Sequence, residues 1–282
     1  MTESPTARLA YHQVDAFTEI AFAGNPAAVY VLDDWLADAH LQAIAAEHNL
    51  AETAFVVPDS AAGGHLRWFT PTCEVELCGH ATLATAHVLL TERTDFSDPL
   101  TFTTEKAGPL HVSREGETLW LNLPADPPTA CHETMDAVAD ALGGSPDEWH
   151  VASNYVAVFG SRDTVAGLSP DFAALARALT GTNRGVIVTA PADETDETVD
   201  FVSRYFAPAH GINEDPVTGS AHCTLAPYWG TRLGRERLVG HQISARGGRL
   251  SCDLAGERVH VGGPAVTVAA GTLFLDASEV AP

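Results

Sequence analysis

Short apolar segments, separated by glycine, proline and polar residues, run along the whole chain. They are rich in Val, Phe, Leu and Thr, which is typical of β-strands. Between them, apolar residues recur at helical spacing: Leu41, Ile44 and Ala45 form one stripe, and a second lies within 81–90. The pattern therefore predicts an α+β fold. In the first half of the chain we expect strands at 27–32, 53–57, 66–69, 100–104, 110–112 and 118–123.

The pattern also repeats within the chain. Residues 67–71 read Arg-Trp-Phe-Thr-Pro, and residues 204–208 read Arg-Tyr-Phe-Ala-Pro. Seven residues after each proline a polar residue precedes Gly or Pro, as Cys78-Gly79 and Asp215-Pro216, and a helix of small residues follows. Such self-similarity indicates a duplicated structural unit.

A further match sets the expected domains. Residues 108–124 and 248–264 both read as a strand, a turn containing Gly-Glu, a second strand and a proline. We predict a first half-domain over 1–124, to which 265–282 returns, and a second half-domain over 125–264. Each half is expected to wrap a sheet around its small-residue helix, and the halves are expected to face each other across a cleft.

Composition and charge exclude several classes of protein. Hydrophobic residues make up 45% of the chain, no apolar run is long enough for a membrane helix, and the first ten residues do not resemble a secretory signal. We therefore expect a cytoplasmic protein. A net charge of −22 and a single lysine, Lys106, argue against nucleic acid or an anionic membrane as a partner.

Cofactor and metal motifs are absent from the sequence. The five cysteines are irregularly spaced, and the thirteen histidines show neither HxxxH nor HExxH spacing. Neither a GxGxxG segment nor a phosphate-binding Walker loop occurs. We therefore predict no disulfide framework, no metal site and no cofactor.

The two small-residue helices suggest where a ligand binds. The first N–H groups of a helix have no partner within the helix, and its dipole makes that end partly positive. Small residues at 79–81 and 218–221 allow a carboxylate to approach the backbone. Ordinary helix capping is the alternative, because Asp215 before Pro216 is also a suitable N-cap and first helical residue.

Four segments in order carry a resemblance to a known family. They are FAGNPAAV at 22–29, NLAETAF at 49–55, CGHAT at 78–82 and EDPVTGSA at 214–221. Together they resemble the PhzF-like family (phenazine-biosynthesis isomerase type), relatives of diaminopimelate epimerase and proline racemase. The resemblance implies two pseudo-symmetric halves, each a barrel-like sheet around a central helix. It also implies a cofactor-free isomerase that is usually a homodimer.

The resemblance implies a role for individual residues. The acid/base glutamate of the family falls on Glu52, and its active-site histidine, aspartate and serine fall on His80, Asp215 and Ser220. A half-buried carboxyl group at Glu52 could take and return a proton. The alternatives are a solvated glutamate at Glu52 and a surface histidine at His80. The residues expected to bind substrate are Asn25, Cys78, Gly79, Gly219 and Ser220; for Asn25, turn formation alone is an equal explanation.

Cys78 separates two mechanisms. The racemase and epimerase relatives use one thiol from each half. Here Cys78 occupies the first thiol position, Asp215 is taken to occupy the second, and Cys223 lies eight residues further on. A two-thiol racemase would therefore lack one base, although Cys78 remains open as an auxiliary acid or base.

The sequence thus predicts a cofactor-independent isomerase that moves a proton on a small carboxylate-bearing substrate. The expected substrate is an unsaturated amino, imino or hydroxy acid, in secondary-metabolite biosynthesis by resemblance. One alternative is an amino-acid racemase or epimerase. The other is a non-catalytic protein that binds a small ligand or interacts with a partner.

Overall fold

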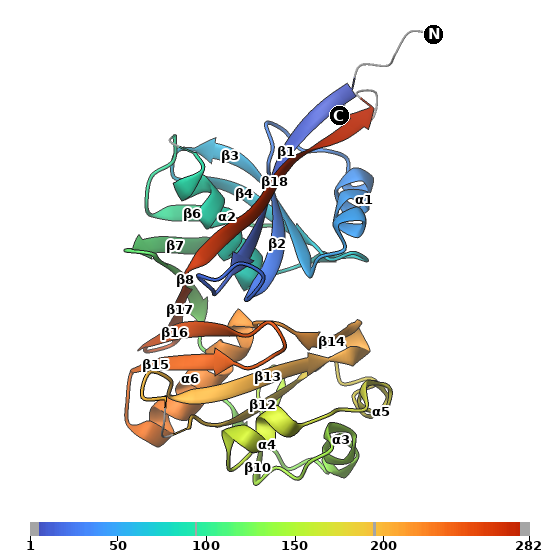
Figure 1. The fold of residues 1–282 in the computed structure, drawn as a ribbon, viewed down its shortest axis with the longest axis vertical. Helices are drawn as coiled ribbons and strands as arrows, with labels where there is room; N and C mark the ends of the chain where they lie inside the picture. Colours follow the sequence, from blue (N-terminus) through green and yellow to red (C-terminus); the bar gives the residue numbers. More distant parts are fainter. Residues whose placement is uncertain (1–5, 94, 194–195, 277–282) are drawn as a thin grey trace. The chain divides into compact units, whose positions relative to one another are not determined.

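The computed structural model describes residues 6–93, 95–193 and 196–276 (Figure 1). The chain forms two compact units: unit 1 is Met1–Asn122 with Gly263–Pro282, and unit 2 is Leu123–Gly262. The sequence placed the boundaries after residues 124 and 264, and residues 277–282 of that prediction lie outside the described residues. Both units consist mostly of strands with few helices, which confirms the expected α+β class.

Unit 1 contains the first ten elements of the chain and the last one. They are β1 (Thr6–Ala16), β2 (Asn25–Val31), α1 (Asp38–His48), β3 (Glu52–Ser60), β4 (Gly63–Phe69), β5 (Glu74–Val75), α2 (Gly79–Thr91), β6 (Leu100–Thr103), β7 (Leu110–Glu115), β8 (Thr118–Pro124) and β18 (Ala265–Asp276). Strand β8 runs two residues past the boundary of the unit.

Parallel and antiparallel pairs alternate along the sheet of unit 1. Strand β1 is antiparallel to β2, β2 is parallel to β3, β3 is antiparallel to β4, and β4 is parallel to β6. Strands β6, β7 and β8 continue the sheet as antiparallel neighbours. Strand β18 pairs with the full length of β1, from Thr6 opposite Asp276 to Ala16 opposite Ala265. The segment after residue 264 therefore belongs to this sheet.

The sheet of unit 1 is covered by a helix on each face. In β2, Ala28 and Tyr30 join the apolar cluster under α1, while Ala27 and Val29 are equally buried and point to the opposite face. Helix α2 contacts β1, β2, β3 and β18 (Figure 1). Its residues are buried on all sides, as expected for a helix enclosed by a sheet. Burial on both faces explains why β2 and β3 are continuous apolar runs.

Unit 2 contains the remaining elements. They are β9 (Thr129–Ala130), α3 (Asp136–Leu142), β10 (Glu148–Val151), β11 (Tyr155–Val158), α4 (Arg162–Gly167), α5 (Phe172–Ala178), β12 (Val186–Pro191), β13 (Phe201–Ala207), the 3-10 turn η1 (Pro208–His210), β14 (Ile212–Asp215), α6 (Gly219–Leu233), β15 (Arg237–Gln242), β16 (Gly248–Ala255) and β17 (Arg258–Gly263).

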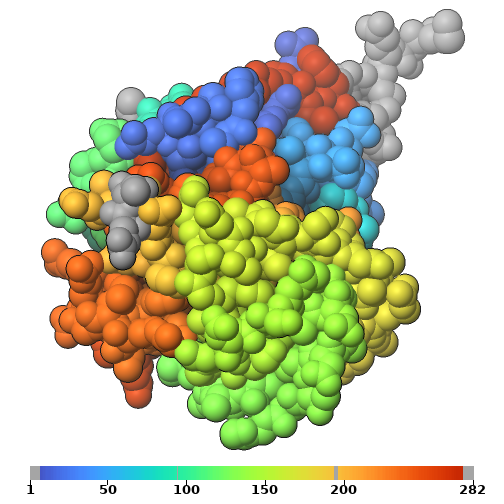
Figure 2. Space-filling view, turned by 60° about the horizontal axis from the view of Figure 1, so that its bottom comes forward, coloured from blue at the N-terminus to red at the C-terminus, as the bar shows by residue number. Residues whose placement is uncertain are grey.

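The strands of unit 2 pair in the same order and sense as those of unit 1. Antiparallel β10–β11 is followed by parallel β11–β12, antiparallel β12–β13, parallel β13–β15 and then antiparallel β15–β16–β17. Helices α3 and α5 bury Val138, Leu142 and Leu175 against β11, β12 and β13. The green-to-yellow surface in Figure 2 is the segment that carries them. Helix α6 packs against β15 and β16.

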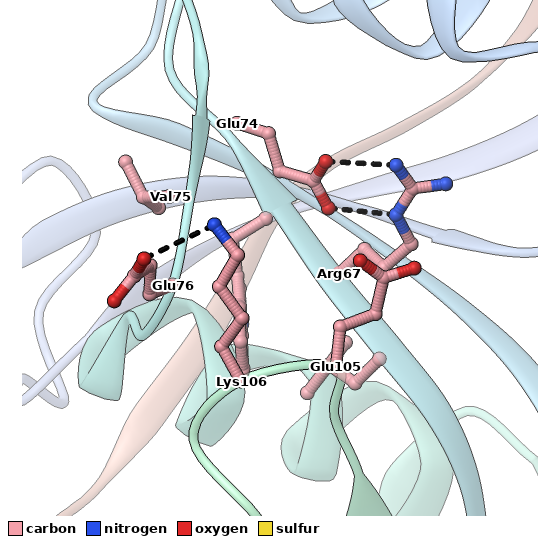
Figure 3. A pocket seen from close by; sticks show the side chains of 8 residues that line it. Arg67, Glu74, Val75, Glu76, Glu105 and Lys106 are labelled. Atoms are coloured by element: carbon pink, nitrogen blue, oxygen red, sulfur yellow. Dashed lines mark hydrogen bonds and ion pairs between the residues drawn. The ribbon is translucent and has the colours of Figure 1, made fainter.

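An arginine–glutamate pair occupies the same place in both units. Arg67 of β4 donates two hydrogen bonds to Glu74, at 2.7 and 2.8 Å, and Figure 3 shows this pair beside the Lys106–Glu76 ion pair. Arg204 of β13 donates to Glu214 in the same way, at 2.7 and 2.9 Å. These arginines begin the two repeated pentapeptides, and each pair ties its strand to the short strand that follows.

The helices of the described residues are modest in length. The two longest are α2, with 13 residues, and α6, with 15. Among the described helices, none has both the length and the apolar character that crossing a bilayer demands.

Candidate active site

The starts of β2, β3 and α2 meet at one edge of the unit 1 sheet. Strands β2 and β3 run parallel with Ala27 opposite Glu52, so their first residues lie at the same edge. Helix α2 begins at Gly79, and its N-cap residue Cys78 has an extended backbone. Side chains from three distant parts of the sequence therefore come together here.

Three reactive side chains are in contact at this edge. Nε2 of His80 lies 3.2 Å from Oε2 of Glu52, and Sγ of Cys78 lies 3.5 Å from Nδ1 and 4.0 Å from Nε2 of the same ring. The side chains of His80 and Glu52 are only 6% and 12% exposed, and Cys78 is buried. The alternatives of a solvated glutamate at Glu52 and a surface histidine at His80 are therefore wrong.

The surroundings of His80 keep its ring neutral. Burial lowers the pKa of His80 to about 3, against the opposing effect of a hydrogen bond to the backbone carbonyl of Pro26. Nδ2 of Asn25 lies 3.1 Å from Nδ1 of the ring. A neutral imidazole has one N–H and one lone pair. The ring can therefore stay neutral in a proton transfer only by accepting a proton at one nitrogen while donating from the other.

The Gly-Asn-Pro segment positions Asn25 for this contact. Gly24 has a φ of +64°, and a Cβ there would lie 2.2 Å from the carbonyl oxygen of Ala16, so only glycine fits. The N–H of Phe22 donates to Oδ2 of the buried Asp15 at 2.7 Å, which fixes the preceding turn. Asn25 is fully buried. Turn formation alone therefore does not explain Asn25, because its side chain contacts His80.

In unit 2, the predicted residues lie around the start of α6. Asp215 is the last residue of β14, and Thr218 is the N-cap of α6. The hydroxyl of Thr218 donates a short hydrogen bond to Oδ2 of Asp215. Gly219 is buried and Ser220 is exposed. The structure thus forms one cluster in unit 1 and a second at the helix start of unit 2.

Gln242 of β15 is a residue that the sequence analysis missed. Its Oε1 accepts a hydrogen bond from the backbone N–H of Thr218 at 2.9 Å, and its Nε2 donates to the carbonyl of Asp215 at 2.7 Å. It is completely buried, so it holds the turn between β14 and α6. No motif marks this glutamine. The Pro26 carbonyl, which bonds to the His80 ring, was missed as well, because a backbone group leaves no signal in the sequence.

The alternative that Asp215 and Pro216 cap helix α6 is wrong. Both residues lie before the helix, because β14 continues through Asp215 and the N-cap is Thr218. Cys78 is the N-cap of α2 and Thr218 is the N-cap of α6. The counterpart of Cys78 is therefore Thr218, and the assignment of Asp215 to the second thiol position is wrong.

The remaining thiol of α6 does not replace the missing one. Sγ of Cys223 donates to the carbonyl of Gly219 at 3.6 Å inside the helix. Burial raises the pKa of Cys223 to about 12, so the group stays a thiol. At the start of α6 a threonine hydroxyl stands where a second thiol would be needed.

The unit 1 cluster also contains a set of metal-ligating groups. Glu52, Cys78 and His80 each offer one ligand atom, and these atoms all lie within 4.8 Å of one another. The search for HxxxH and HExxH spacing could not find this set, because Glu52 is remote in the sequence from the other two.

The fold is shared with proteins of a known class. A hydroxyproline epimerase from Agrobacterium vitis shares it with a TM-score of 0.57 over 95% of this chain and 93% of that one. The sequences are only 12% identical, so this likeness shows the α+β fold of the epimerase and racemase type and no more.

Closer relatives give the family. The PhzC-PhzF family model, described as phenazine biosynthesis-like protein, matches residues 14–271. The chain therefore belongs to this family, which confirms the resemblance. A PhzF-family structure from Enterococcus faecalis is 45% identical, with a TM-score of 0.89 over 95% of this chain and 100% of that one. A Pseudomonas aeruginosa protein that bears the name uncharacterized isomerase is 51% identical over 269 residues, 95% of this chain and 99% of that protein.

Proposed function

We propose that this protein is an isomerase that moves a proton between two carbons of a small unsaturated amino, imino or hydroxy carboxylic acid. The observation that carries the proposal is the 3.2 Å contact between Oε2 of Glu52 and Nε2 of His80 within a buried cluster. The names of relatives such as the Pseudomonas aeruginosa isomerase support the same class of reaction.

In the proposed reaction, Glu52 is the group that takes the proton. Its carboxylate removes a proton from one carbon of the substrate and returns it to another, so substrate and product have the same composition. The neutral ring of His80 orients the carboxyl group through Nε2 and can share its proton. Asn25 and the Pro26 carbonyl hold that ring in place.

The substrate carboxylate is proposed to bind at the start of α2. Removing a proton from carbon leaves negative charge on the substrate, and the N–H groups of a first helical turn stabilise such charge. The absence of a side chain at Gly79 leaves room beside the first turn. The first turn of α2, with Gly79 and His80, would therefore bind the substrate carboxylate.

In unit 2, Asp215, Gly219 and Ser220 at the start of α6 are proposed as functional residues of the same enzyme. Asp215 is held by Thr218 and Gln242, and the exposed Ser220 follows the N-cap by two residues. The chemistry uses the side chains alone, so the proposal includes no cofactor. The family description supports a substrate from secondary metabolism as part of the same proposal.

The test is proton NMR in heavy water on a panel of small unsaturated amino, imino and hydroxy acids. We expect the native protein to incorporate deuterium or move a double bond in at least one compound, and Glu52→Gln to lose this activity by at least roughly 100-fold, the lower range for a general base. Glu47→Gln, which removes an exposed carboxyl group from α1, is the matched control and should keep it. Exchange that survives in Glu52→Gln would contradict the proposed role of Glu52.

A further inference from the structure

We propose that Glu52, Cys78 and His80 form a binding site for one thiophilic divalent cation, such as Zn²⁺, and that this cation inhibits the enzyme by competing with substrate. The cation site rests on the geometry of the three side chains alone. The inhibition rests on the proposed function, in which Glu52 and His80 carry out the proton transfer.

The distances between the ligand atoms suit a tetrahedral ion. Zinc bonds of about 2.0–2.3 Å to nitrogen, oxygen and sulfur place ligand atoms roughly 3.4–3.6 Å apart in a tetrahedral site. Here Oε2 of Glu52 lies 3.2 Å from Nε2 of His80, and Sγ of Cys78 lies 4.0 Å from the same nitrogen. All three ligand atoms lie within 4.8 Å of one another, so side-chain shifts of about 1 Å would bring them to these separations.

The neighbours of His80 hold its ring in place. A ligating imidazole usually donates its remaining N–H to a carboxylate, a backbone carbonyl or water, which fixes the direction of the ring. The His80 ring has a hydrogen bond to the backbone carbonyl of Pro26, which is an acceptor of this kind. Nδ2 of the fully buried Asn25 is an N–H donor 3.1 Å from Nδ1, so zinc binding at Nε2 requires the ring proton to move to Nδ1, with the Pro26 carbonyl as its acceptor. Nε2 is thereby directed toward Glu52.

The donor set selects the kind of cation. One sulfur, one nitrogen and one carboxylate oxygen match the ligands of zinc, whereas magnesium and calcium bind through oxygen. Three protein ligands with one open position are the arrangement of zinc sites that exchange their fourth ligand. A thiolate, a carboxylate and a neutral imidazole together carry two negative charges, which the cation neutralises.

The same position in unit 2 offers a different set. Thr218 stands where Cys78 is, and Ser220 stands where His80 is, by their places relative to the helix N-cap. Among the residues that the structure describes, the set in unit 1 is the one group of three whose ligand atoms lie this close. We therefore expect one tightly bound cation for each chain.

Competition follows from the atoms involved. A cation held by Oε2 of Glu52 and Nε2 of His80 occupies the carboxylate and the ring nitrogen that the proposed proton transfer uses. The substrate carboxylate, which is proposed to bind at the adjacent start of α2, would then meet a blocked acid/base group. Zinc should accordingly raise the KM for substrate.

The direct test is titration of the full chain with Zn²⁺ by calorimetry and with Co²⁺ by absorption spectroscopy. We expect one site for each chain and a thiolate-to-cobalt charge-transfer band. Cys78→Ala should abolish the band and weaken zinc binding by at least roughly 100-fold, beyond what loss of a supporting residue costs. Cys73→Ala removes an exposed thiol five residues away and should bind as the native chain does. Mg²⁺ should not bind.

The outcomes separate the cation site from the proposed reaction. Equal zinc affinity in native and Cys78→Ala protein, or a cobalt spectrum without the thiolate band, would overturn the inference even if the protein is an active isomerase. Circular dichroism and thermal unfolding of both Cys78→Ala and Cys78→Ser will distinguish a loss of binding from a loss of fold. If zinc binds through the Cys78 thiolate but the protein isomerises no compound, the cation site is supported and the inhibitory role is rejected. An active isomerase whose KM zinc leaves unchanged would also reject the competition.

Discussion

Thr82 and His222 make the same hydrogen bond in their respective helices. The hydroxyl of Thr82 donates to the carbonyl of Cys78 at 2.6 Å, and Nδ1–H of His222 donates to the carbonyl of Thr218 at 2.9 Å. In each case the acceptor is the helix N-cap four residues earlier. The two helices therefore start in equivalent ways, and this relationship, rather than spacing from a proline, aligns Cys78 with Thr218.

His222 should make stability depend on pH. Burial lowers the pKa of His222 to about 4, with the hydrogen bond to Thr218 acting in the opposite direction. Between the unfolded pKa near 6.5 and about 4, the unfolded chain binds a proton that the folded chain does not, so stability falls as pH falls through this window. The contribution is about 3 kcal/mol. Urea unfolding at pH 4–7.5 should show a shallower pH dependence for His222→Gln than for the native chain; equal slopes would refute the role of His222.

Gly240 should not tolerate a side chain. A Cβ at Gly240 would lie 2.7 Å from both the His222 and Phe201 rings, which are buried and cannot move aside. We expect Gly240→Ala to lower the free energy of unfolding by about 1–3 kcal/mol through overpacking. Gly167→Ala is the matched control, because a Cβ there meets nothing within 4 Å at the end of α4. Thermal unfolding of the two variants compares them directly, and equal melting temperatures would contradict the packing argument.

The forked contacts of Arg204 should matter more than its charge. Arg204 donates to both oxygens of Glu214 and to the carbonyl of Leu168, and its side chain is 12% exposed. Lysine keeps the charge but cannot form this fork, so Arg204→Lys should cost about 2 kcal/mol in the free energy of unfolding. Arg249→Lys changes an ion pair whose arginine is 52% exposed, and should cost less than about 0.5 kcal/mol. Denaturant unfolding measures both; similar losses would show that the fork is unimportant.

Asn25 should act by positioning His80. Under the proposed function, Asn25→Ala should reduce kcat by roughly 10–100-fold with little change in KM, because the His80 ring loses its orientation while the carboxylate site remains. The ¹⁵N shifts of the His80 ring should change in the same variant, which a residue that only forms the turn would not cause. If both the ring shifts and kcat are unchanged, Asn25 only forms the turn and does not position His80.

The sequence predicted the elements more surely than their ends. Strands β2 and β3 follow continuous apolar runs because both faces of the sheet are buried, and such runs are visible in sequence. Capping by Asp215 stayed open as an alternative because Asp-Pro satisfies a capping rule equally well at the end of a strand. Gln242 could not be found, since its role depends on strand pairing that brings β15 beside β13.

Local resemblance located the chemistry but not its surroundings. Glu52 and His80 lie within motifs, so both could be named, and the structure brings them into contact. Their burial, the support from Pro26 and the nearness of Cys78 to the carboxyl group depend on three strand and helix starts that meet only in the folded chain. The fold class was predicted from the pattern of apolar and polar residues, whereas these contacts form only in the folded chain.

The pairing of β1 with β18 determines when unit 1 can finish folding. Its sheet joins Thr6–Ala16 to Ala265–Asp276, so the two strands are separated by almost the whole described chain. Unit 2 has most of its strands within one continuous stretch and can form as soon as residue 262 has left the ribosome. Unit 1 has to wait, with β1 exposing an unpaired edge, until the later strand is synthesised. The unit that contains Glu52 and His80 is thus the first to be translated and the last to be complete.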